Sequence, residues 1–531
     1  MWLRLEPGDT LRIVEERETN IVCQERHVSR LEAQIQSVRA QTEVTRQFAT
    51  HSPSLPSPIR RLPNELLVEI LSFECGPIRF FTRTGYKIPI YDNRGLLHSY
   101  ASNRIFELLA VCTHWRDIIV FTPTLWSNLS LHLDYPSNFG RKVLTTLEKL
   151  LRRSAGAPLT LVLGGVFDSS YRGKEFFSAL AHHSHRWQSF AWSVFWAEDT
   201  EMYDVAPQSL PLLQSLEVGY RLSSFVTSSI LNWTNLSEII LGTFDDKSEL
   251  PWSQITKLGL IEKGIDPQLY RALGCFPNVQ TLSIRFSDLP FRNGKTLIPI
   301  VDLERLHTFT ISNILLPCSD VFVALFSSLT AHMLTTLSLS AVDLRVNERS
   351  SSLPLDSVTS FLLRSRCRLL HLTLENFHLK EDELVSLLQL TPFLVTLRIM
   401  EPNPPQDASQ SDRKKCNILT EGLLHQLIGL ECTPKDGENP SDSPTLLLPN
   451  LERLYITVNG ATFEDQSFAR MVKSRWIPKS SMSEVEMKCL RFVEVKLRGR
   501  RMDDIARKEL DSVRKAGMVV SLLDEVEEAR S

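Results

Sequence analysis

A short apolar unit recurs through most of the chain, and it restricts the fold more than any other feature. In each unit a single residue separates two residues of the Leu, Ile, Val or aromatic type. The units are Leu129–Leu131, Leu159–Leu161, Phe190–Trp192, Leu216–Val218, Ile239–Leu241, Leu258–Leu260, Leu282–Ile284, Phe309–Ile311, Leu337–Leu339, Leu372–Leu374, Leu397–Ile399, Leu454–Ile456 and Val495–Leu497. From Val218 to Leu339 the second apolar residues follow one another at steps of 19 to 28 residues. Such a period is typical of stacked repeats with one strand and one helix or turn each.

The repeats predict an α/β solenoid, because no single unit can bury its apolar side without its neighbours. Residues 357–364 and 381–389 place apolar side chains on one side, as helices between strands do. We expect a loop near 346–356, and mobile surface loops in the Pro- and charge-rich insertion at 401–448. Residues 503–516 read as a further helix in the charged tail.

A second feature stands near the amino end, where Ile59–Phe73 reads as a helix. Pro63 suits the first helical position, and Glu65 suits the first turn, where the helix dipole favours an acid. Apolar residues then recur on one broad face, with Glu69 off it. A second helix-like run covers Ile105–Ile119 and is followed by Pro123–Trp126.

Together these two runs resemble the F-box, especially that of the large families of mushroom-forming fungi. The resemblance is carried by Leu62, Pro63, Leu66, Ile70, Val111, Cys112, Trp115, Arg116, Pro123, Leu125 and Trp126. It departs from compact F-boxes in a loop-like insert at 75–97. The repeats likewise resemble the irregular leucine-rich arrays of F-box proteins. The resemblance implies a substrate-recruiting subunit of an SCF-type cullin-RING ubiquitin ligase, a receptor without an active site or cofactor of its own.

In this reading the F-box docks on the Skp-type adaptor, and the repeats bind a target protein. The expected adaptor-binding residues are Leu62, Pro63, Leu66, Ile70, Leu108, Leu109 and Val111. Full burial of Leu62, Leu66 and Ile70 would contribute roughly 5–9 kcal/mol, whereas association costs something like 4–15 kcal/mol. The second run must therefore share the interface.

The resulting organisation is an α/β leucine-rich-repeat solenoid preceded by an all-α F-box and an N-terminal helix. The expected parts are an N-terminal helix at 1–50, a Pro/Ser linker at 51–58, the F-box at 59–131, the solenoid at 132–500 and a charged tail at 501–531. In the N-terminal helix, Val14, Ile21, Val28 and Ile35 fall seven apart, a partial coiled-coil seam. Self-association and packing on the F-box both fit that seam.

The net charge, the cysteines and the distribution of apolar residues limit the kinds of partner and the cellular compartment that we expect. Lys and Arg number 59 against 62 Asp and Glu, a net charge of −3, which disfavours nucleic-acid binding through overall charge. Nine scattered cysteines fit reduced thiols in an intracellular protein. We find no signal peptide and no apolar run of the ~20 residues that span a membrane, so we expect a cytoplasmic or nuclear protein.

Several local motifs read as structural. His182, His183 and His185 stand without further metal ligands, so we expect no metal site. We expect Cys112 to pack as a small hydrophobe, and Trp115 to brace the helices more than to line an interface. The run Arg498–Arg501 beside Asp503 reads as a solvated strand end.

Two other functions fit parts of the sequence. One is a leucine-rich-repeat interaction scaffold that acts independently of a ubiquitin ligase. The other is an enzyme, which the lack of an acid/base or nucleophile constellation disfavours. The target of a receptor is not identified by the sequence, although the strand residues Glu217, Glu238, Arg285 and Arg398 are candidates to face it.

Overall fold

The computed structural model divides into two compact units, Met1–Phe73 and Glu74–Ser531. We describe the following residues: 21–22, 24–26, 28–43, 59, 62–81, 90–91, 97–98, 104–134, 141–167, 171–196, 209–219, 233–242, 251–262, 272–286, 300–314, 319–342, 354–403, 418–428, 446–476 and 487–525.

The described residues of the first unit form two helical stretches. The described residues of 21–43 are helical and exposed, in agreement with the predicted N-terminal helix. Their exposed side chains include Ile21, Val28 and Ile35 of the predicted seam. The second stretch is α2, Asn64–Cys75, which continues to the start of the second unit.

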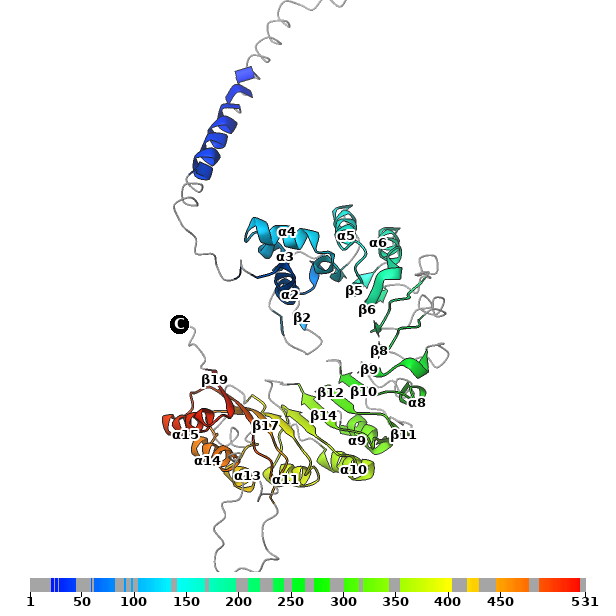
Figure 1. The fold of residues 1–531 in the computed structure, drawn as a ribbon. Coiled ribbons are helices and arrows are strands. Elements are labelled where there is room, and N and C mark those ends of the chain that lie inside the picture. The colour runs from blue at the N-terminus through cyan, green and yellow to red at the C-terminus, as the bar shows by residue number, and fades with distance from the viewer. Residues whose placement is uncertain are drawn as a thin grey trace, which may run out of the picture. The chain divides into compact units, whose positions relative to one another are not determined.

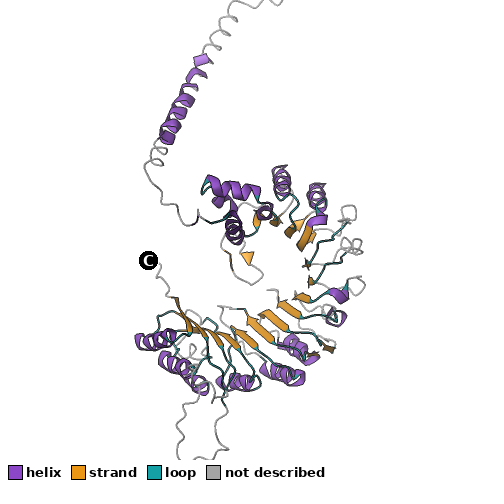
Figure 2. Ribbon diagram, in the orientation of Figure 1, coloured by secondary structure: helices purple, strands orange, loops and turns teal. Residues whose placement is uncertain are grey.

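Among the described residues of the second unit, fifteen strands form one parallel sheet (Figures 1 and 2). They are β1 (Ile78–Phe81), β4 (Asn128–Asp134), β5 (Leu159–Phe167), β6 (Trp187–Trp196), β7 (Ser215–Val218), β8 (Glu238–Leu241), β9 (Lys257–Glu262), β10 (Thr281–Phe286), β12 (Thr308–Ile314), β14 (Thr336–Ala341), β15 (His371–Glu375), β16 (Thr396–Met400), β17 (Arg453–Asn459), β18 (Phe492–Arg498) and β19 (Val519–Glu525). Each strand lies beside the strand before it, so the order never reverses. This order is compatible with a solenoid and confirms the α/β class.

Helices connect many of these strands. They are α3 (Arg104–Leu109), α4 (Thr113–Phe121), α5 (Arg141–Arg153), α6 (Tyr171–Ala181), α8 (Ala272–Cys275), α9 (Ser319–Ser328), α10 (Leu355–Ser365), α11 (Glu381–Gln389), α13 (Glu421–Gln426), α14 (Asp465–Ser474) and α15 (Asp504–Lys515). The helices α9 to α15 lie on one face of strands β12 to β19 (Figure 1). The structure confirms the predicted helices at 357–364, 381–389 and 503–516, whereas most of the predicted loop at 346–356 lies outside the described residues.

The register explains the repeated apolar units. In each strand from β10 to β17 the two apolar residues of the unit are buried, and they pair with those of the neighbouring strands, as Leu282 pairs with Phe309 and Ile284 with Ile311. This face meets the helices, since Phe309 of β12 lies 5.7 Å from Phe326 of α9 and 6.3 Å from Phe361 of α10, between ring centroids. The core therefore lies between the helices and one face of the sheet, as period-2 alternation requires.

Two predicted units are offset by two residues. Leu161 and Leu163, not Leu159 and Leu161, align with Leu129 and Leu131. In β18 the aligned pair is Val493 and Val495 in place of Val495 and Leu497. In both strands the apolar alternation is longer than one unit. A shift of two residues leaves the same side chains on the buried face, so alternation alone does not determine which residues pair with the neighbouring strand.

Three segments differ from the predicted organisation. The insert at 75–97 is not wholly a loop, because Ile78–Phe81 forms β1 and pairs with β4. The region 59–131 is consequently not all-α. The tail also contributes β19 to the sheet. β1 and β19 are the two edge strands of the sheet, and β1 alternates apolar residues too briefly to stand out from the surrounding Gly and Pro.

Two buried charged side chains, Glu401 and Arg475, hold described parts of the insertion at 401–448 against the neighbouring strands and helices through hydrogen bonds to the backbone. The carboxylate of Glu401 accepts hydrogen bonds from the backbone N–H groups of Ile418 at 2.8 Å, Leu419 at 3.2 Å and Asn459 at 2.9 Å. The guanidinium of Arg475 donates to the carbonyls of Leu427, Leu447 and Leu448. The polar parts of the insertion that we expected to be surface loops lie outside the described residues.

Candidate functional site

The helix α2 begins at Asn64, one residue after the proline that the sequence analysis placed at the first helical position. The carbonyl of Pro63 accepts the first helical hydrogen bond, from the N–H of Leu67 at 3.1 Å, so Pro63 immediately precedes the helix. Its missing N–H costs nothing at this position. Glu65 stands in the first turn, where the positive end of the helix dipole favours a carboxylate.

The apolar residues of α2 divide between two faces. Leu67 and Leu71 are buried, whereas Leu66 is 50%, Ile70 41% and Phe73 90% exposed. Positions 66, 70 and 73 are spaced i, i+4 and i+7, so they lie on one side of the helix. We call these three residues the α2 stripe. Of the other predicted residues, Leu62 is half-buried and Pro63 exposed.

The second predicted helix is two helices, which corrects the single run expected over 105–119. α3 ends at Leu109, α4 begins at Thr113, and Cys112 between them is extended, with φ −162° and ψ 168°. The Cys112 sulfur accepts a hydrogen bond from the N–H of Trp115 at 3.5 Å. Cys112 therefore caps α4 instead of packing within a helix.

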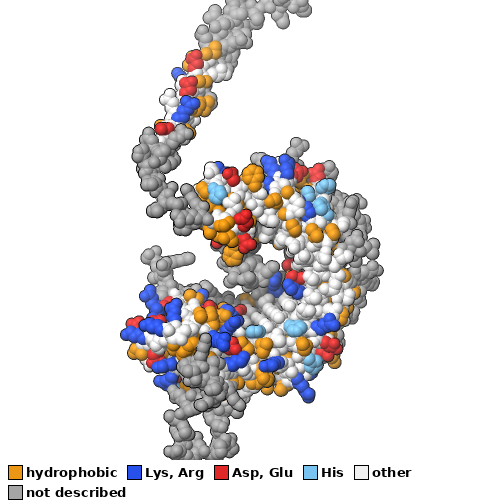
Figure 3. All heavy atoms as spheres, in the orientation of Figure 1, with side chains coloured by type: hydrophobic (Ala, Val, Ile, Leu, Met, Phe, Trp, Pro, Cys, Tyr) orange, Lys and Arg blue, Asp and Glu red, His pale blue; other side chains and the backbone are white. Residues whose placement is uncertain are grey.

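The turn and helices α3 and α4 carry a second exposed apolar surface, within the second unit (Figure 3). Of the predicted residues Leu108 and Leu109 are half-buried, and Val111 is 57% exposed. Phe106 and Phe121 are also exposed, Phe121 by 80%, and the sequence analysis missed them together with Phe73. The run Ile118–Phe121 offered a signal, because four successive apolar residues on a helix cannot all face one core.

The aromatic residues near α4 have different roles. Trp126 is fully buried, and its indole N–H donates to the carbonyl of Ile119 at 2.7 Å. The guanidinium of Arg153 lies 4.4 Å above the Trp126 ring. Trp126 is thus core to this unit. Trp115 is half-buried, which neither requires nor excludes bracing.

Two groups in the second unit have side chains with potential chemistry, the histidines at 182–185 and the buried Cys75. His183 lies 5.4 Å from His182 and 6.4 Å from His185, ring to ring, and burial together with Arg186 lowers the pKa of His183. Within the described ranges, no group of three or more His, Cys, Asp or Glu could hold a metal. Burial and Glu74 raise the pKa of the Cys75 thiol to about 11, which disfavours a nucleophilic thiolate.

The face of the sheet away from the helices is a further candidate surface. Glu217, Glu238, Arg285 and Arg398 all lie on it, and all are half-buried. Glu238 is 3.9 Å from the ammonium of Lys257 on the next strand, between N and O atoms. Arg398 instead lies over an aromatic ring, 4.3 Å from the centroid of Tyr455.

No protein-family model and no curated protein matches this chain. None of the helices described here is long and apolar enough to cross a membrane.

Proposed function

We propose that this chain is a substrate-recruiting F-box subunit of an SCF-type cullin-RING ubiquitin ligase. The helices of residues 59–131 dock on the Skp-type adaptor, and the leucine-rich repeats hold a target protein for a separate enzyme to modify. The proposal starts from the sequence resemblance. It is supported by one structural observation, the α2 stripe, since Leu66 and Ile70 follow Pro63 and remain exposed.

Exposed aliphatic and aromatic side chains grouped on one helix are typical of protein interfaces. Because Leu66 and Ile70 are already about half-buried, burial of the rest of the α2 stripe against a partner would contribute about 3–5 kcal/mol. Association itself costs about 4–15 kcal/mol. The exposed residues of α3 and α4, among them Val111 and Phe121, offer the additional apolar area that a stable complex needs.

Co-purification with a Skp-type adaptor tests the proposal. The double variant Leu66→Glu, Ile70→Glu places two charges in the stripe, and we expect the recovered adaptor to fall about tenfold or more. Ser72→Glu is the matched control, because Ser72 is exposed on another side of α2. We expect the control to recover as much adaptor as the wild type.

The two variants also separate the proposal from its rival. Unchanged adaptor recovery by the double variant, or no recovery by the wild type, would favour a leucine-rich-repeat scaffold that acts without the ligase. Both side chains are exposed, so the variants should unfold at the wild-type temperature, and a thermal scan checks this.

A further inference from the structure

On the open face of the sheet, opposite the helices, the size of the side chains changes from the middle strands to the last strands. On β10, β12 and β14 its central positions are short hydroxyl residues, Thr281, Ser283, Thr308, Thr310, Thr336 and Ser338. On β17 and β18, and at Arg398 of β16, the aligned positions carry large side chains instead. We define the open-face cluster as Arg398 of β16, Arg453 and Tyr455 of β17, and Phe492 of β18.

Three side chains of the cluster lie close together, and the planes of its two rings are tilted by 35°. The Arg398 guanidinium lies 4.3 Å from the centroid of the Tyr455 ring, and that ring lies 5.0 Å from the ring of Phe492. Val519 of β19 pairs with Phe492 and is itself exposed, so the apolar surface extends to the edge strand. Arg and Tyr in such partly desolvated positions are the residue types that dominate binding energy at interfaces.

The Arg398 guanidinium is available to bind a carboxylate of a partner. Within the described residues no carboxylate forms an ion pair with Arg398, although Glu375 and Glu494 lie on the same face. A guanidinium over an aromatic ring can still donate its N–H groups to a carboxylate. Arg453 carries a second positive charge on the next strand, in a diagonal position, since it pairs with Thr396.

We propose that the open-face cluster binds an acidic linear segment of a target protein, with a carboxylate on Arg398 and a neighbouring apolar side chain on Phe492 and Val519. For its biological role this inference rests on the proposed receptor function. Arg398 and Phe492 are two strands apart and offset by two residues along the strand, about 12 Å. An extended chain covers that span in three or four residues, so the Asp or Glu should lie about three or four residues from the apolar side chain.

Selection from a displayed library of random 12-residue peptides on the full chain tests this inference. We expect the wild type to enrich peptides with Asp or Glu about three or four residues from an aromatic or aliphatic residue. Arg398→Glu should lose these peptides and enrich Lys or Arg at the acidic position. Arg285→Glu is the matched control, an arginine on the same face in β10, and should enrich the wild-type peptides.

One enriched peptide, made synthetically, then gives the size of the effect. We expect its affinity to fall about tenfold or more in Arg398→Gln and in Tyr455→Ala, with thermal unfolding as the check on folding. Enrichment without an acidic position, enrichment unaffected by Arg398→Glu, binding only after phosphorylation, or no enrichment would each overturn the inference. The selection contains no adaptor, and Arg398→Glu should still recover adaptor, so this inference and the proposed function can fail separately.

Discussion

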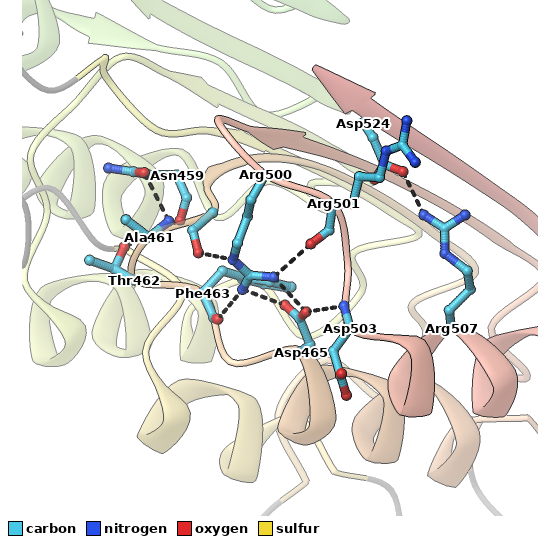
Figure 4. A network of polar contacts seen from close by, with 11 residues as sticks. Asn459, Ala461, Thr462, Phe463, Asp465, Arg500, Arg501, Asp503, Arg507 and Asp524 are labelled. Carbon is cyan, nitrogen blue, oxygen red and sulfur yellow. Dashed lines mark hydrogen bonds and ion pairs between the residues drawn. The ribbon is translucent and has the colours of Figure 1, made fainter. Parts of the chain in front are cut away.

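Arg500 forms a two-pronged ion pair with the buried carboxylate of Asp465 (Figure 4). Its two terminal nitrogens donate to both carboxylate oxygens, at 2.7 and 2.8 Å. The backbone N–H of Asp503 donates to the same carboxylate at 2.6 Å, and Arg500 also donates to the carbonyls of Gly460 and Phe463. The hydrogen bonds to Asp465 raise the pKa of Arg500. One carboxylate thus connects α14, the turn after β18 and the start of α15.

Asp465→Asn should lower the free energy of unfolding by about 2–3 kcal/mol. The amide carries one acceptor in place of two, and it leaves a partly buried guanidinium without its counter-charge. Chemical denaturation at pH 7 measures the loss.

Arg507 and Asp524 provide the comparison for that prediction. Their atoms are 2.5 Å apart, but the contact is single, and 38% of the Arg507 side chain is exposed. Asp524→Asn should therefore cost less than about 1 kcal/mol. Equal losses in the two variants would contradict the account of Asp465.

Glu401→Gln should destabilise the protein by about 1–3 kcal/mol. Burial raises the pKa of Glu401, and the three backbone N–H groups that donate to its oxygens act in the opposite direction. Glutamine has the same shape, but its NH₂ group would face one of those donors and leave a buried N–H without an acceptor. Unfolding by denaturant tests this, and a variant as stable as the wild type would show that the N–H contacts contribute little.

Arg475→Lys should also destabilise, by about 2–4 kcal/mol. The Arg475 side chain is fully buried, and burial lowers its pKa to about 10, so it remains charged at neutral pH. Its fork reaches three carbonyls at both ends of the 428–446 segment, whereas a lysine cannot reproduce that geometry. Limited proteolysis provides the readout. We expect faster cleavage between residues 428 and 446 in the variant, and an unchanged cleavage rate there would count against the role of Arg475.

Stability should fall below pH 7 through three half-buried histidines. Burial lowers the folded-state pKa of His378, and the pKa values of His183 and His371 shift in the same direction. As the pH drops below the unfolded value of about 6.5, the unfolded chain gains protons that the folded chain does not. The free energy of unfolding therefore decreases on acidification, by up to about 1.4 kcal/mol per pH unit for each histidine.

His378→Gln isolates one of these contributions. Unfolding at pH 7 and pH 5.5 should show a smaller acid loss in the variant than in the wild type. If the variant and the wild type lost the same free energy of unfolding between pH 7 and pH 5.5, His378 would not contribute to the acid sensitivity.

The sequence predicted the features that repeat. Apolar alternation, with its regular spacing, was sufficient for the parallel α/β arrangement, for the buried faces of β10 to β17 and for the helices between some strands. The sequence prediction was wrong where a side chain forms hydrogen bonds with residues far away in the sequence. Arg498–Arg501 was read as a solvated strand end, yet Arg500 pairs with Asp465, which is 35 residues away, and Arg498 donates to the carbonyl of Glu401, which is 97 residues away. Of that run, Gly499 and Arg501 are exposed as predicted, whereas Arg498 and Arg500 are half-buried.

The candidate interface was predicted only in part. Helical spacing placed Leu66 and Ile70 correctly on α2, but it could not tell the exposed side from the buried side occupied by Leu67 and Leu71, because both are aliphatic. Sequence reasoning also joined α3 to α4, since Cys112 resembles a packing residue until its cap geometry is seen.

Hydrogen–deuterium exchange of the full chain, with and without a Skp-type adaptor, tests the central claim most directly. If the α2 stripe is left uncovered for the adaptor, amides of residues 62–75 should exchange more slowly in the complex, while those of α11 keep their rate. A complex that forms with unchanged exchange across residues 62–75, or the absence of any complex, would contradict the claim.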